Sequence, residues 1–183
     1  RYNCKDQQLS KLVHFFNILG NVDLLGSKTL EKFFEAGFTT LESIYSVKLE
    51  NMITLGLGPK QSSNIMDQIL RSKTEEIDDW RFLAAFGIPH LGKAESKRLL
   101  SKVPLEKINE LSSKEIETIE GFGPIASPSI YKEIQHIWPT ISLLINIGFS
   151  LRSTESKKIE VDSSVFNLNI IFTGKMDLSR PEM

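Results

Sequence analysis

Apolar residues recur at helical intervals along most of the chain. Leu9, Leu12, Val13 and Phe16 occupy positions i, i+3, i+4 and i+7, the spacing of one face of an α-helix. Similar spacing recurs in Leu30, Phe33 and Phe34; Ile65, Ile69 and Leu70; Leu83 and Phe86; Leu99 and Leu100; Ile116 and Ile119; and Ile130 and Ile134. The pattern predicts an all-α fold over residues 7 to about 148, with short loops.

Four glycines punctuate this helical pattern at nearly even intervals. Gly26, Gly58, Gly92 and Gly123 lie 31 to 34 residues apart, and each one precedes a helix-like segment. The residue directly before each glycine is apolar and is expected to anchor its turn in the core; these residues are Leu25, Leu57, Leu91 and Phe122. Even spacing with a repeated local motif indicates four copies of one structural unit.

Several helix starts are readable. Thr40 and Ser43 mark one, and Ser112 with Glu115 forms a capping box. Pro59 and Pro124 follow their glycines, as first-turn prolines do. Pro128 would interrupt a helix that started at Pro124, so we expect the last long helix to start at Pro128, with Ser127 as its cap.

A helix, a Gly-apolar-Gly turn and a second helix form the helix-hairpin-helix pattern. Glycine permits a tight turn and close approach of a phosphate. The free N–H groups at the second helix start then attract that phosphate, with a contribution from the helix dipole. A lysine just inside the helix adds a charge-assisted contact. The predicted DNA-binding residues are Gly26, Lys28, Gly56, Gly58, Lys60, Gly92, Lys93, Gly121 and Gly123.

The four repeats are not equivalent. The second is the most regular, whereas the first has Leu24 and the third has His90 in place of the leading glycine. We therefore expect the first and third hairpins to be partly structural. A single Gly-x-Gly between helices is usually only a turn, so the prediction of DNA binding rests on the four repeats together.

Charge balance at first sight argues against nucleic acid. The chain has 22 Lys and Arg against 23 Asp and Glu, a formal net charge of −1, whereas strong phosphate binders are usually basic. Oriented N–H groups supply much of the attraction at a hairpin, so local lysines suffice.

No apolar stretch is long enough to cross a bilayer, and the chain begins with Arg1. We expect an intracellular piece of a longer protein, without membrane association.

Other polar clusters receive structural interpretations. His14, His90 and His136 lack metal-ligand spacing and are interpreted as structural residues in apolar surroundings. The acidic run at residues 75–79 is interpreted as the first turn of a helix. Trp80 and Trp138 are expected in the core or between domains.

The composition changes after Leu151. Residues 152–164 are polar and suit a linker, and residues 168–172 then have the character of a buried strand. Ser179 and Glu182 predict a further helix start. One strand and part of a helix cannot bury a core, so residues 165–183 are expected to open a further domain.

These features together resemble the C-terminal half of bacterial-type NAD-dependent DNA ligases. The resemblance covers nearly the whole chain and is most specific at Gly58–Asn64 and Gly87–Gly92. The segments that carry it are Leu12–Phe15, Asp23–Lys28, Phe33–Phe38, Leu57–Asn64, Phe86–Gly92, Ile119–Pro124, and Ile171–Met176 with Ser179 and Arg180.

The resemblance implies a domain order. It assigns residues 1–6 to the end of a zinc finger, 7–151 to a tandem helix-hairpin-helix domain, 152–164 to a linker and 165–183 to the start of an α/β BRCT domain. Cys4 falls where the last zinc ligand would lie, although one cysteine cannot hold zinc alone.

The resemblance also implies a function. This segment would clamp nicked duplex DNA independently of base sequence, in replication and repair. The parent enzyme would use NAD, Mg²⁺ and structural Zn²⁺. The family's adenylating Lys-x-Asp-Gly motif is absent, so we expect this chain to bind no cofactor and to need an upstream nucleotidyltransferase domain or a split-chain subunit.

Two alternatives remain open at this point. One is a non-enzymatic helix-hairpin-helix module that binds Holliday junctions or assists a nuclease. The other is a helical protein-interaction module with no role on DNA.

Overall fold

The computed structural model describes residues 5–154, which are mostly helical. The elements in chain order are α1 (Lys5–Leu19), α2 (Ser27–Glu35), α3 (Leu41–Tyr45), α4 (Leu49–Thr54), α5 (Pro59–Thr74), β1 (Ile77–Asp78), α6 (Asp79–Ala85), α7 (Lys93–Leu100), the 3₁₀ helix η1 (Leu105–Glu110), α8 (Ser113–Thr118), α9 (Ala126–Asn146) and β2 (Leu151–Arg152).

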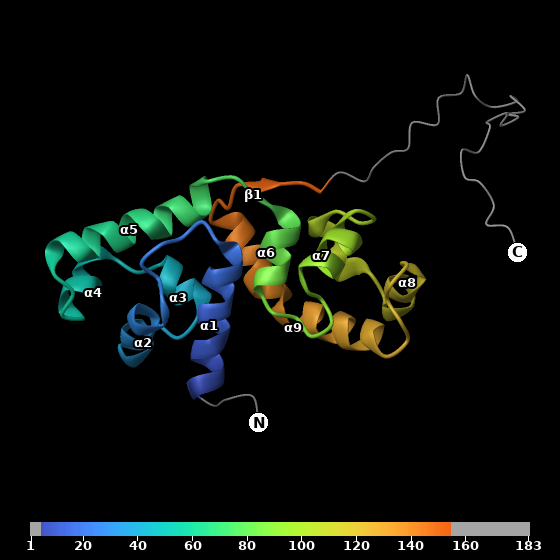
Figure 1. Ribbon diagram of the computed structural model, residues 1–183, viewed down its shortest axis with the longest axis horizontal. Coiled ribbons are helices and arrows are strands. Elements are labelled where there is room, and N and C mark those ends of the chain that lie inside the picture. Colours follow the sequence, from blue (N-terminus) through green and yellow to red (C-terminus); the bar gives the residue numbers. More distant parts are fainter. Residues whose placement is uncertain (1–4, 155–183) are drawn as a thin grey trace, which may run out of the picture.

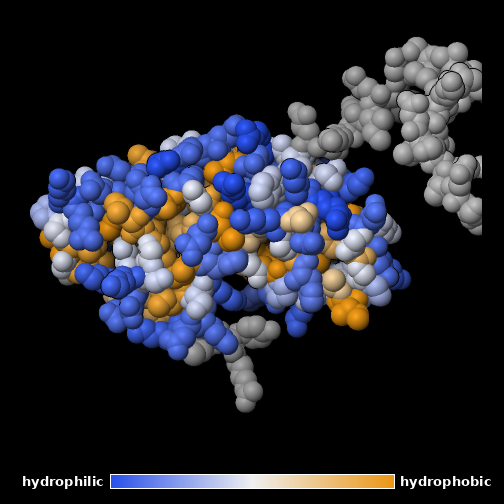
Figure 2. All heavy atoms as spheres, in the orientation of Figure 1, coloured by the Kyte–Doolittle hydropathy of each residue, from blue (hydrophilic) through white to orange (hydrophobic). Residues whose placement is uncertain are grey.

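The helices form an elongated body around a central pair. α1 and α6 pack together near the middle, with α2 to α5 on one side and α7 and α8 on the other (Figure 1). α9 packs on both α8 and α3, so it ties the two sides together. The face drawn in Figure 2 is largely hydrophilic, with hydrophobic patches that are most extensive on the side of α2 to α5.

An aromatic cluster forms the centre of the core. The ring of Phe15 on α1 lies edge-on to Phe86 and Phe82, with centroids 5.2 and 6.4 Å apart. Phe149, beyond α9, packs on Phe82 at 5.1 Å and on Tyr45 at 5.2 Å. Residues from the start, middle and end of the described chain therefore share one core.

Most of the expected helix starts are confirmed. Thr40 and Ser43 form a capping box, Pro59 is the first residue of α5, and the Ser112 N–H donates to the Glu115 carboxylate at 2.7 Å. The Ser112 hydroxyl also donates to this carboxylate, and the two hydrogen bonds from Ser112 lower the pKa of Glu115 below its ordinary value.

The expected start of α9 is wrong by two residues. α9 begins at Ala126, ahead of Pro128, and Pro124 lies in the preceding turn. Because the first four N–H groups of a helix have no partner inside it, a proline in the first turn costs no hydrogen bond. The buried Ser127 does not cap the helix; its N–H and hydroxyl both donate to the Gly123 carbonyl, at 3.0 and 2.9 Å.

The all-α prediction missed a small parallel sheet in which β1 pairs with β2. The sheet also changes the interpretation of the acidic run, since only Asp79 of that run starts a helix. Arg152 on β2 contacts Asp78 at 2.8 Å, and the buried Asp79 accepts hydrogen bonds from the N–H and hydroxyl of Thr154. The acidic residues thus hold the segment that follows α9.

Several expectations fall outside the described residues. These are Cys4, the strand at residues 168–172, the helix start at Ser179 and Glu182, and most of the proposed linker. Within residues 5–154, no helix combines the length and apolar character that a membrane span requires.

Candidate nucleic-acid interface

The four repeated glycines occupy equivalent positions at helix starts. Gly26, Gly58 and Gly92 directly precede α2, α5 and α7, and Gly123 lies three residues before α9. Each glycine carbonyl accepts the N–H of the residue four positions later, at 2.8 to 3.0 Å; these donors are Leu30, Ser62, Ser96 and Ser127. The apolar residue before each glycine is 1 to 5% exposed, so the expected anchoring in the core is confirmed.

The residue two positions before each glycine adopts the same left-handed backbone in all four turns. The φ angles are +68° at Leu24, +72° at Gly56, +64° at His90 and +91° at Gly121. A side chain in this conformation costs about 1–2 kcal/mol. The first and third turns therefore keep the hairpin geometry despite lacking the leading glycine.

At three of the four turns, nothing among the described residues requires the residue at the helix start to be glycine. Gly26, Gly58 and Gly123 have φ outside the left-handed region, and a Cβ at each would meet no atom within 4 Å among the described residues. Neither backbone strain nor packing explains glycine there. An open surface at a helix start does allow a ligand to approach the backbone closely.

Charge at these surfaces comes from exposed lysines. Lys28, Lys60 and Lys93 lie in the first turns of α2, α5 and α7 and form no ion pair with residues 5–154. The N–H groups of a first helical turn have no acceptor within their own helix. Lysine charge, free N–H groups and the helix dipole all favour an anion at the same place.

The third turn carries an acidic side chain. Oε2 of Glu95 lies 3.0 Å from the place that a Cβ on Gly92 would occupy. Glu95 is the third residue of α7, so its carboxylate reaches back over the helix start much as the glutamate of a capping box does. This turn offers an anion a less favourable site than the second turn.

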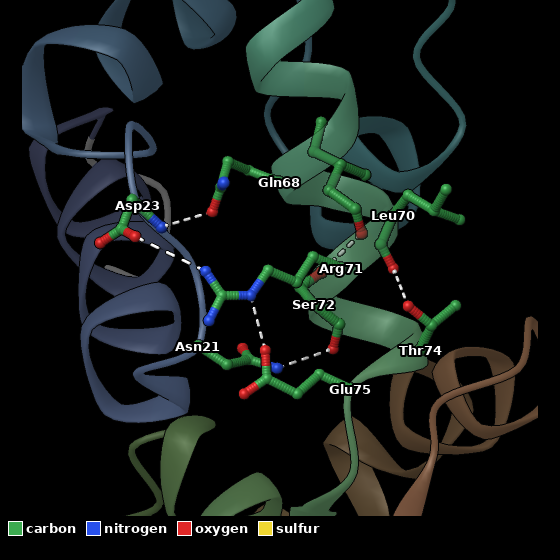
Figure 3. A network of polar contacts seen from close by, with 9 residues as sticks. Asn21, Asp23, Gln68, Leu70, Arg71, Ser72, Thr74 and Glu75 are labelled. Atoms are coloured by element: carbon green, nitrogen blue, oxygen red, sulfur yellow. Dashed lines mark hydrogen bonds and ion pairs between the residues drawn. The ribbon is translucent and has the colours of Figure 1, made fainter.

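The first turn is fastened to α5 by the polar network in Figure 3. The N–H of Asp23 donates to Gln68 at 2.8 Å, and Asn21 donates to the Ser72 carbonyl at 3.3 Å. Arg71 lies 3.7 Å from Asp23 and 2.6 Å from Glu75. Because Gly58 directly precedes α5, this network holds the first and second turns in a defined relative position.

One recurring residue escaped the sequence analysis. Serine follows the glycine by four positions in the second, third and fourth repeats, and all three serines are buried. The hydroxyls of Ser62 and Ser96 donate to the carbonyls of Leu57 and Leu91, at 3.3 and 3.4 Å. The sequence shows serine four positions after the glycine in three repeats, but it does not show that the hydroxyl donates to a backbone carbonyl, which is the reason for a polar residue on this apolar face.

The histidines and tryptophans have different environments. The side chains of His14, His90 and His136 are exposed, so none of the three is a buried core residue. Trp80 and Trp138 are half-buried and pack against the core, as expected. Within residues 5–154, no group of three His, Cys, Asp or Glu side chains has the arrangement of a metal site.

Comparison with known proteins first gives the class of domain. Residues 16–69, which include the first two glycine turns, match the model of the SAM-like helix-hairpin-helix tandem. Together with the described helices, this match supports a helix-hairpin-helix type of domain that includes residues 16–69.

The second comparison gives particular relatives. A DNA ligase of Desulfatibacillum aliphaticivorans is 40% identical over 99% of the chain, and one of Ruthia magnifica subsp. Calyptogena magnifica is 36% identical over the same share. A DNA ligase of Psychromonas ingrahamii is 34% identical over 95%. The chain spans 27 to 30% of the length of these relatives. The resemblance to DNA ligases is thus confirmed, for a segment shorter than a third of such a protein.

Proposed function

We propose that this chain is the DNA-binding portion of an NAD-dependent DNA ligase, and that it clamps nicked duplex DNA through backbone phosphates. The observation that carries the proposal is the open glycine at a helix start, repeated in turns of the same backbone conformation. Each turn would act as one helix-hairpin-helix unit, with Gly56 and Gly121 as the leading glycines of the second and fourth. Phosphates are the same in every sequence, so binding would be independent of base sequence.

The shape of the molecule supports several simultaneous phosphate contacts. α4 and the start of α5 lie at one end of the long axis, and α8 lies at the other (Figure 1). The second and fourth turns, which follow α4 and α8, would therefore contact well-separated phosphates. The net charge of −1 is compatible with this role because oriented N–H groups and a few local lysines supply the attraction.

In the whole protein, this portion would hold the duplex while other domains join the 5′-phosphate to the 3′-hydroxyl through enzyme-AMP and DNA-adenylate intermediates. NAD and Mg²⁺ would act in an upstream nucleotidyltransferase domain or on a split-chain subunit. Structural Zn²⁺ would need cysteines besides Cys4, because this chain has one cysteine. DNA as the substrate would place the protein inside the cell.

A binding titration tests the proposal. The 183-residue chain is titrated into a fluorescent nicked duplex, an intact duplex and a four-way junction at several KCl concentrations. We expect a dissociation constant on the order of micromolar or lower at low salt, weakening as salt rises. Absence of measurable binding at low salt would overturn the proposal. Strong preference for the junction would favour the DNA-architecture module instead.

A further inference from the structure

The fourth turn lacks the cation found in the other three. Lys28 and Lys60 lie two positions after their glycines, and Lys93 lies one position after its glycine. The corresponding residues after Gly123 are Pro124 and Ile125, and Ile125 is 85% exposed. If this turn contacts a phosphate, its positive charge has to come from another element.

Arg98, on the last turn of α7, lies across the fourth turn. Its Cζ is 2.9 Å and its Cδ 3.5 Å from the position that a Cβ on Gly121 would take, and Nη1 also enters that space. The missing side chain at Gly121 thus lets the arginine lie against the backbone of the turn. Arg98 is exposed and forms no ion pair with residues 5–154.

We propose that Arg98 is the phosphate-binding cation of the fourth turn, supplied by α7 of the preceding hairpin. This inference rests on the proposed function and assigns one residue within it. A guanidinium offers several N–H donors in a planar fork that matches a phosphate. Sharing Arg98 would also join the third and fourth hairpins into one contact region, since α7 begins at the third turn.

A purely structural role for Arg98 makes a different prediction. A cation in the last turn of a helix interacts favourably with the helix dipole, and the side chain also covers Gly121. Loss of either structural contribution, the dipole interaction or the cover over Gly121, would change the free energy of unfolding. Neither would change the number of phosphates that the protein neutralises, which the slope of log K against log salt measures.

The test compares variants of the full chain on the nicked duplex between about 50 and 200 mM KCl. Arg98→Gln keeps much of the side-chain length and removes the charge. We expect binding to weaken several-fold and the slope of log K against log salt to become less negative by about 0.9, the value for one phosphate contact on duplex DNA. Arg98→Lys should retain the slope. Lys107→Gln is the matched control, because Lys107 is an exposed cation on η1, outside the four turns.

A rescue variant tests the position directly. Ile125 occupies the register of Lys28 and Lys60, so Ile125→Lys in the Arg98→Gln background should restore the lost slope. An unchanged slope in Arg98→Gln, alongside a reduced slope in Lys60→Glu, would overturn the role of Arg98 and leave the proposed function intact. Absence of DNA binding by the wild-type chain would overturn both.

Discussion

Replacement of Gly58 by valine separates binding from folding at the second turn. Gly58 has φ −61° and ψ 154°, a conformation open to any residue, and a Cβ there meets nothing within 4 Å among the described residues. An apolar residue at a helix N-cap costs about 1 kcal/mol. Reduced entropy of the unfolded chain offsets about 0.4–1 kcal/mol of that cost. We expect the free energy of unfolding to change by less than about 1 kcal/mol.

The effect on DNA binding should be larger. The valine side chain would stand between an approaching phosphate and the N–H groups at the start of α5. Hydrogen bonds to charged groups contribute about 1.5–3 kcal/mol each. Loss of one such bond corresponds to about 10- to 150-fold weaker binding. Gly58→Ala, with a smaller obstruction, should give an intermediate dissociation constant.

Fluorescence anisotropy with a nicked duplex measures the dissociation constants, and circular dichroism melting measures stability. Lys60→Glu and Lys48→Glu form a charge-matched pair of exposed lysines, one at the turn and one at the far end of α4. Only the first should weaken binding strongly. If Gly58→Val binds DNA as tightly as the wild type while melting at the same temperature, the assignment of this glycine to phosphate contact is wrong.

Three further predictions concern the second and third turns and the core. Glu95→Gln should tighten binding about three- to five-fold, because a carboxylate no longer faces the phosphate across a few ångströms of water; an equal or weaker affinity would contradict this. His90→Gly should raise the free energy of unfolding by up to about 1 kcal/mol, because glycine adopts the left-handed conformation without strain, whereas Gly56→His should lower it by about 1–2 kcal/mol. Thermal melting measures both changes, and melting temperatures that shift in the same direction would contradict the prediction. Burial raises the pKa of Tyr45, although its hydrogen bond with Ser72 opposes the shift. The unfolded chain therefore loses this proton first, and stability should decline above about pH 10; urea unfolding of Tyr45→Phe should show a smaller decline, and an identical one would refute the reasoning.

Local signals predicted the helices and the turn residues well. Periodicity located the helices because an amphipathic helix needs apolar residues on one face wherever it packs. The capping boxes at Thr40 and Ser112 depend on residues three apart, so the sequence displays them completely. DNA binding at the glycine positions remains a prediction.

Long-range contacts account for what the sequence analysis missed. The strand at Ile77–Asp78 forms because Leu151–Arg152 runs beside it, more than 70 residues away along the chain. Two residues have too little periodicity to indicate a strand. The acidic run looked like a helix start for the same reason, since its partners Arg152 and Thr154 are distant in sequence.

The amino-acid sequence by itself determined the repeat of four glycine turns, the buried apolar residue in each and the resemblance to DNA ligases, because each depends on residues close together in the chain. The tertiary structure decided which turns are alike and which differ. It showed that Leu24 and His90 adopt the backbone of the missing glycines, and that Arg98 reaches the fourth turn from α7. Backbone strain at one residue and contact between a helix and a turn distant in sequence are set by packing, and no local pattern reports them.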